Sequence, residues 1–263
     1  MNEYEQKPSR VITIPVAIIV AGALIAISVI YTSAPRERSL TKVTETVTEV
    51  TPIDEEDHVL GNPNAPIVIV EYSDTECPFC KNFHTTMLRL VDKYGKDSKL
   101  AWVYRHMPIT NLHPKAWKEA IATECAAQVG GGSSAFWKYV NKIYEITPSN
   151  DKLEEGKLIT TATNLGLDTQ KFQSCLQQNL TEDKVKRDYE NGLDISEGRP
   201  GTPLSIMLLS EPLENSKKTA LKNIVRNEGL DAFVNVANDG QSITIKGAFP
   251  YEVMALMIDL ILQ

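Results

Sequence analysis

The sequence predicts an α/β fold with an inserted helical domain, preceded by one N-terminal transmembrane helix. Three observations carry this prediction. Residues 11–31 are apolar, residues 67–104 show a strand, a helix and a strand in turn, and residues 114–191 show helical periodicity alone. A strand–helix–strand order is typical of a parallel α/β unit, so the helical residues are interpreted as an insertion into that fold.

Composition excludes several other classes of protein. Of the 263 residues, 42% are hydrophobic and 23% are charged, which is ordinary for a globular protein and unlike a disordered chain. The formal net charge is −7, whereas nucleic-acid-binding proteins usually present a basic face. We therefore expect no nucleic-acid partner.

The beginning of the chain is expected to lie outside the folded domain. Residues 11–31 carry no charge and reach the roughly 20 residues that a helix needs to cross a bilayer. A cleaved signal peptide is the alternative, but its apolar region is usually shorter, which favours a retained anchor. Residues 1–10 then form a cytoplasmic segment, residues 32–57 a flexible tether, and residues 58–263 the folded domain.

The folded domain opens with a strand–helix–strand unit. Residues 67–72 form an apolar run that predicts a buried strand. Apolar residues from Phe83 to Tyr94 then recur at helical spacing, and Gly95 predicts the end of that helix. Residues 100–104 predict a second strand, parallel to the first.

The rest of the domain alternates between helical and extended patterns. The insertion of about residues 114–191 is expected to contain four helices: 115–129, 134–144, 153–165 and 169–178. After it we expect a strand, a helix, a hairpin and a closing helix: 204–209, 213–229, 233–237 with 242–246, and 251–262.

The sequence Cys77-Pro78-Phe79-Cys80 lies at the junction between the first strand and its helix. A CxxC at this place is typical of a redox dithiol. Pro78 suits the first helical position, so Cys77 is expected at the helix N-terminus, where free N–H groups and the dipole stabilise a thiolate. Cys80, one turn further on, is expected to be more buried and to close the disulfide.

A zinc half-site is the alternative interpretation of this motif. Zinc normally takes four ligands, and His84 follows Cys80 at helical spacing. The chain has no second CxxC and no HxxxH, however, and its other two cysteines are single. We expect no metal and, because no cofactor-binding motif occurs, no cofactor.

Cys125 and Cys175 lie in two of the helices predicted for the insertion. In an oxidising compartment we expect a structural disulfide between them, and two buried free thiols are the alternative. Closing a loop of this length would stabilise the fold by roughly 4 kcal/mol in the entropic account of disulfides.

Two further residues are candidates for the site. Glu71 lies in an apolar strand six residues before Cys77, where a buried carboxylate is costly, so it is interpreted as a proton acceptor or relay for Cys80. The alternative is a side chain that faces solvent. Pro203 opens a strand, and a cis Thr202–Pro203 bond would leave the Thr202 backbone free to pair with an extended substrate.

In combination these motifs resemble the DsbA-like thiol–disulfide oxidoreductases, a thioredoxin-fold family with a helical insertion. The likeness runs from about residue 58 to the C-terminus and rests on the following motifs: Glu71, Cys77-Pro78-Phe79-Cys80, Arg105-His106-Met107-Pro108, His113-Pro114, Glu124-Cys125-Ala126-Ala127-Gln128, Phe136-Trp137, Phe172-Gln173-Ser174-Cys175-Leu176 and Gly201-Thr202-Pro203. It implies that Cys77 is the nucleophile, Cys80 its partner, Pro203 a cis-proline beside them and Glu71 a buried acid.

The same resemblance implies a substrate surface and shows two departures. Pro78, Phe79 and Thr202 are expected to contact substrate. The dipeptide between the cysteines is Pro-Phe, so no imidazole lies inside the motif. Residues 210–241 are longer than the usual tight connection between the last two strands, and an extra helix and strand are expected there.

The expected function is a membrane-anchored oxidase of protein thiols. Its expected partners are reduced exported proteins as substrates and a membrane-embedded protein that re-oxidises the dithiol, and the chain is expected to be a monomer. A dithiol oxidase with a stable disulfide requires an oxidising compartment, so the C-terminal domain is expected on the extracytoplasmic side of the cell membrane. A reductase or isomerase on the same fold and a non-catalytic peptide-binding module are the alternatives.

Overall fold

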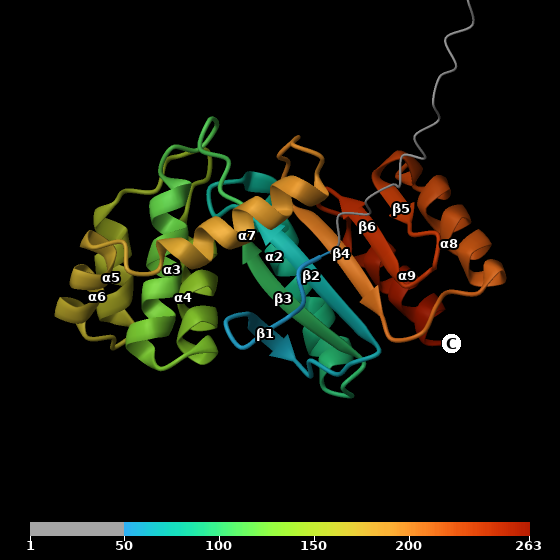
Figure 1. Cartoon of the computed structure of the whole chain (residues 1–263), viewed down its shortest axis with the longest axis horizontal. Coiled ribbons are helices and arrows are strands. Elements are labelled where there is room, and N and C mark those ends of the chain that lie inside the picture. The colour runs from blue at the N-terminus through green and yellow to red at the C-terminus, as the bar shows by residue number, and fades with distance from the viewer. Residues whose placement is uncertain (1–49) are drawn as a thin grey trace, which may run out of the picture. The chain divides into compact units, whose positions relative to one another are not determined.

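A computed structural model describes residues 50–263 of the chain (Figure 1). The anchor expected over residues 11–31 and most of the expected tether lie outside this range. Within the range, no helix combines the length and the apolar character that a membrane crossing requires.

A mixed six-stranded sheet lies at the centre of the described residues, in the order β1-β3-β2-β4-β6-β5. β2 runs parallel to β3, as the strand–helix–strand pattern predicts, and every other neighbouring pair is antiparallel. The strands are β1 (His58–Gly61), β2 (Ile67–Ser73), β3 (Leu100–His106), β4 (Leu204–Leu209), β5 (Val234–Val236) and β6 (Ser242–Lys246).

Helices cover both faces of this sheet. α2 (Pro78–Leu90), α8 (Asn215–Asn227) and α9 (Tyr251–Leu262) pack on one face, and α7 (Glu182–Ile195) crosses the other (Figure 1). Every residue of β2 is buried, because both of its faces are covered. Short π and 3-10 turns follow α2 and α8: Val91–Gly95 and Asp231–Phe233.

Four helices between β3 and α7 form most of a second apolar core, to which Val185 of α7 also belongs. They are α3 (Ala116–Gly130), α4 (Ser133–Ile146), α5 (Gly156–Asn164) and α6 (Thr169–Gln177), close to the four ranges predicted. A disulfide joins Cys125 of α3 to Cys175 of α6, with a Cα–Cα distance of 5.8 Å. The mixed α/β fold with a helical insertion is thereby confirmed.

α7 and β1 were not expected from the sequence. α7 is rich in charged residues, and its buried side includes polar residues such as Asp188 and Asn191. Gly192 lets this helix lie close to the sheet, because a Cβ there would come within 2.7 Å of the Tyr72 ring. An apolar stripe is the usual signal of a helix that packs on a sheet, and here polar contacts take its place.

The segment between β4 and β6 contains the extra helix and strand that its length indicates. α8 packs beside α9, and β5 pairs antiparallel with β6 at the edge of the sheet (Figure 1). This addition lies at the opposite end of the sheet from β1 and the helical insertion.

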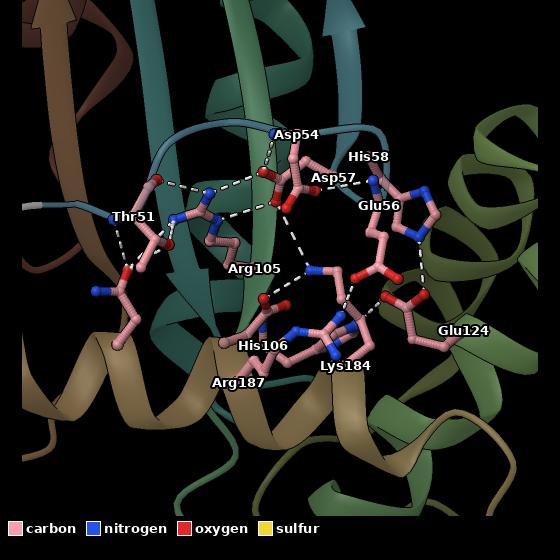
Figure 2. Close-up of polar contacts among 12 residues, drawn as sticks. Thr51, Asp54, Glu56, Asp57, His58, Arg105, His106, Glu124, Lys184 and Arg187 are labelled. Atoms are coloured by element: carbon pink, nitrogen blue, oxygen red, sulfur yellow. Dashed lines mark hydrogen bonds and ion pairs between the residues drawn. The ribbon is translucent and has the colours of Figure 1, made fainter.

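Residues 51–57 form a strap that is held against β3 and α7 (Figure 2). Arg105 of β3 is only 2% exposed, and its Nε and Nη2 donate to the two Asp57 carboxylate oxygens at 3.0 and 2.8 Å. Lys184 and Arg187 of α7 make ion pairs with Asp57 and Glu56. The sequence predicts that residues 51–57 belong to a flexible tether. In the structure, buried charge pairs fix this segment against the folded domain.

Candidate active site

The two cysteines of the CxxC motif lie where β2 ends and α2 begins. Cys77 is the N-cap residue of α2, with extended backbone angles, and Pro78 takes the first helical position. Both cysteines are free thiols; Cys77 is 5% exposed and Cys80 is fully buried. The helix start therefore leaves the Cys77 side chain slightly exposed and encloses Cys80 completely.

The electrostatics of the two thiols differ. A hydrogen bond from the Cys80 thiol lowers the pKa of Cys77 to about 6, against the opposing effect of burial. The backbone N–H groups of Phe79 and Cys80 at the helix start add to this effect, because they point at the sulfur. Burial raises the pKa of Cys80, and the Cys77 charge raises it further. At neutral pH Cys77 is mostly a thiolate while Cys80 keeps its proton.

Thr202 and Pro203 lie directly beside Cys77. The Thr202–Pro203 peptide bond is cis, and the Cys77 thiol Sγ lies 3.5 Å from the Thr202 carbonyl oxygen. Pro203 is buried and its carbonyl accepts from Gly247 N–H at 2.8 Å, which ties this turn to the end of β6. The sequence thus brings together residues that are 125 positions apart.

Exposed apolar side chains lie on segments next to the dithiol. The Phe79 side chain, which lies between Pro78 and Cys80 in the motif, is 64% exposed. Leu112 is 67% exposed, in a segment whose Ile109 N–H and His113 Nδ1 both contact Asp74, three residues before Cys77. Sequence reasoning pointed to Phe79 and missed Leu112, because a single leucine in a loop carries no pattern.

Glu71 is fully buried, so the alternative of a solvent-facing side chain does not hold. Burial raises the pKa of Glu71 to about 8, and the negative charge of Cys77 raises it too. Among the described residues no well-aligned hydrogen bond satisfies its two carboxyl oxygens, although Ser73 and Trp102 lie near enough to lower its pKa. At neutral pH this carboxyl group holds a proton beside the buried thiol.

His84, considered above as a zinc ligand, has another partner. It lies in α2, and its Nε2 is 2.7 Å from the Asn141 side-chain oxygen of α4. The described residues contain no group of three side chains suited to a metal ion. Burial lowers the pKa of His84 to about 4, so its ring is neutral.

A cluster of buried acidic residues precedes the dithiol and was not foreseen. Asp74 and Glu76 flank Thr75 directly before Cys77, and Glu119 of α3 lies against them. The side chains of Asp74, Thr75, Glu76 and Glu119 are all at most 2% exposed. The sequence offered one usable signal, two carboxylates within three residues of a reactive cysteine.

Comparison with known families decides the assignment. A family model described as thioredoxin matches residues 54–203, more than half of the chain. The chain belongs to this thioredoxin family. Its matched part includes the dithiol, the helical insertion and the cis-proline.

Solved structures with the same fold are DsbA proteins. The alpha-DsbA1 protein of Wolbachia pipientis covers 82% of this chain and 96% of its own, with a TM-score of 0.58 and 19% identity. DsbA2 of Pseudomonas aeruginosa covers 79% and 96%, with a TM-score of 0.54 and 22% identity. The DsbA-like thioredoxin fold expected from the motifs is thus confirmed.

Curated relatives share a part of this chain within much longer proteins. The Na(+)/H(+) antiporter NhaA 3 of Salinispora tropica is 32% identical over 172 residues, which are 65% of this chain and 24% of the antiporter. The thioredoxin-family chain therefore spans about a quarter of the length of that relative.

Proposed function

We propose that this protein is a membrane-anchored, extracytoplasmic dithiol oxidase that introduces disulfides into exported proteins. The observation that carries the proposal is the asymmetry of the dithiol: Cys77 has a lowered pKa and Cys80 a raised one. A stabilised Cys77 thiolate stabilises the reduced form, which makes the oxidised form a stronger oxidant.

The reaction transfers two electrons from substrate to the dithiol. A substrate thiolate attacks Cys77 Sγ, the Cys77–Cys80 bond breaks, and Cys80 leaves as a thiolate that takes a proton. Glu71 is protonated at neutral pH and lies close enough to Cys80 to raise the pKa of that thiol, and it supplies the proton. A second substrate thiolate then attacks the substrate sulfur of the mixed disulfide, forming the new disulfide and releasing Cys77 as a thiolate.

The substrate is expected to lie across Phe79 and Thr202. Phe79 offers exposed apolar surface next to Cys77, and Thr202 faces the reactive sulfur from the cis-proline turn. A protein segment in an extended conformation fits this arrangement, because backbone groups and one apolar contact recognise it without regard to its sequence. Pro78, partly buried at the helix start, completes this surface.

The anchor and compartment belong to the same proposal. The uncharged run over residues 11–31 supports a single-pass anchor, and the Cys125–Cys175 disulfide is favoured on the oxidising side of a membrane. A dithiol that has been reduced by substrate needs an electron acceptor, so a membrane-embedded re-oxidising protein is the expected partner. We infer that the chain acts as a monomer.

Trapping of the mixed disulfide tests the reaction. Cys80→Ala removes the resolving thiol, so mixed disulfides with exported proteins should accumulate on Cys77 and be released by reductant. The matched control carries Cys77→Ala in addition and should trap nothing. If the single variant traps no more than the double variant, the catalytic proposal fails.

The reduction potential tests the direction of electron flow. We expect a value closer to that of DsbA, about −120 mV, than to that of thioredoxin, about −270 mV. Equilibration with glutathione buffers gives this value. A potential near −270 mV would assign the protein to the reductases instead.

A further inference from the structure

The three residues before Cys77 are fixed by contacts with the helical insertion and the loop that leads into it. Asp74 accepts from Ile109 N–H at 2.8 Å and pairs with His113 at 2.9 Å, both in the segment between β3 and α3. The Thr75 hydroxyl donates to Glu119 of α3 at 2.6 Å. The backbone that positions the reactive sulfur is thus tied to elements outside the strand–helix unit that carries it.

Glu76 makes the most contacts of the three. Its carboxylate accepts from the Thr147 hydroxyl at 2.9 Å and from the Lys152 and Leu153 N–H groups at 3.0 and 3.1 Å. Its backbone carbonyl accepts from Asn150 N–H at 2.7 Å. The fully buried carboxylate thus has three donors and the backbone carbonyl of Glu76 has one. These four hydrogen bonds fix the loop 147–153, between α4 and α5, beside the start of α2.

Glu119 supplies a fifth contact of a different kind. Its carboxylate oxygen accepts from the Thr75 hydroxyl, its side chain is 2% exposed, and it lies close enough to Glu76 for that carboxyl group to raise its pKa. Because burial also raises the pKa of Glu119, its carboxyl group carries a proton at neutral pH and is a donor toward Glu76.

We propose that the Glu76–Glu119 carboxyl pair is a positioning site for Cys77, in which the proton on Glu119 couples the helical insertion to the redox properties of the dithiol. This inference rests on the proposed function, since it concerns the same dithiol. Neither carboxyl group touches the reacting atoms: Glu119 acts through Glu76 and Thr75, and they act through the backbone at Cys77.

The state of Glu119 changes the site in two ways. With its proton, it bridges Thr75 and Glu76 and adds no charge. Without its proton, it can no longer donate to Glu76, and it places a negative charge close to the Cys77 thiolate, which disfavours that thiolate. Burial, with smaller contributions from Glu76 and Asp74, raises the pKa of Glu119 to about 8. The titratable groups that face it are Glu76 and Asp74 before α2 and Tyr139 of α4.

Two substitutions of Glu119 separate positioning from bulk stability. Glu119→Gln keeps a donor toward Glu76 and an acceptor for Thr75, but it never ionises. Glu119→Leu removes both contacts. Glu155→Gln is the matched control, because Glu155 pairs with Lys118 on the surface of α3 and lies outside the cluster. The readouts are the Cys77 thiol pKa, from thiolate absorbance, and the equilibrium constant with glutathione.

Glu119→Leu should raise the Cys77 pKa by about one unit. At pH values below that pKa, the fraction of Cys77 present as thiolate should then fall about tenfold. Glu119→Gln should match the wild type below pH 7, because the amide reproduces the protonated acid. Above about pH 8 the Gln variant should become the stronger oxidant, by up to about tenfold, since only the wild type gains the extra charge. Glu155→Gln should follow the wild type at every pH.

Either of two results would overturn the proposal. One is a folded Glu119→Leu variant whose Cys77 pKa equals that of the wild type. The other is a ratio of the glutathione equilibrium constants of the Glu119→Gln variant and the wild type that stays constant through pH 8. If the Leu variant does not fold, the Gln comparison decides alone. A wild-type protein that fails to oxidise thiols would overturn the proposed function instead, and the Cys77 titration would still report on the carboxyl pair.

Discussion

At the scale of single residues, burial and the hydrogen bonds at the start of α2 together set the chemistry of this site. Glu71 and Cys80 are both fully buried, and both have raised pKa values. Cys77 lies only three positions before Cys80, but its pKa is lowered. The sequence could indicate Glu71 because a carboxylate in an apolar strand is unusual. It could not indicate Glu119, because a single Glu in a helix is ordinary.

The buried Glu71 carboxyl should destabilise the fold as pH rises. Its pKa is about 8 when folded and near 4.5 when unfolded, so between these values only the unfolded chain releases the proton. Stability is therefore retained at acid pH and lost progressively up to about pH 8, by about 5 kcal/mol in all. Glu71→Gln should remove this loss.

Urea unfolding at pH 5 and pH 8 measures that difference. The gain of Glu71→Gln over the wild type should be larger at pH 8 than at pH 5. A variant whose gain is the same at both pH values would contradict the assignment of a raised pKa to Glu71. The thiol-exchange rate of this variant should also fall, because an amide supplies no proton to Cys80.

At the scale of elements, regular patterns were predictable and polar ones were not. The apolar runs of β2 and β4 and the helical spacing of α3 to α6 correspond to structure nearly residue for residue. α7 was missed because its contacts with β3 include polar ones that no apolar stripe announces: Asp188 accepts from the His106 N–H group and Asn191 accepts from Arg105. The contacts of Glu76 with the loop 147–153 depend on tertiary structure, which no local pattern encodes.

The disulfide between α3 and α6 should stabilise the insertion without taking part in exchange. Cys125 and Cys175 are 50 positions apart, so replacing both by Ala should cost about 4 kcal/mol in the entropic account. Urea unfolding measures this cost. The Cys77 pKa should stay within about 0.3 units of the wild-type value, because the pair belongs to the separate core of the insertion. A large change in that pKa would show that the insertion controls the dithiol through this disulfide.

At the scale of the whole molecule, charged contacts fasten parts of the chain that are far apart in sequence. Arg105 holds Asp57 while α7 holds Glu56, so one network joins the strap, the sheet and α7 (Figure 2). The additional α8 and β5 lie at the other end of the sheet. The site and this network are therefore separate in space, on opposite faces of β2 and β3.

Asp57→Ala should destabilise the protein by about 3 kcal/mol, because it leaves Arg105 buried without its carboxylate. Burial raises the pKa of Asp57, but its bond with Arg105 outweighs this and holds the pKa below its ordinary value. The stabilisation is thus present above about pH 4 and lost as pH falls below it. Chemical unfolding at neutral and acid pH measures both effects, with Asp54→Ala, a more exposed neighbour, as the control.

The strap also determines where a mechanical load enters the domain. A pull on the chain from its N-terminal side reaches Arg105 and α7 first, since these hold residues 51–57. α2 lies on the other face of the sheet and is not part of that connection. Tension on the chain would therefore be borne first by β3 and α7, on the face of the sheet opposite the helix that follows Cys77.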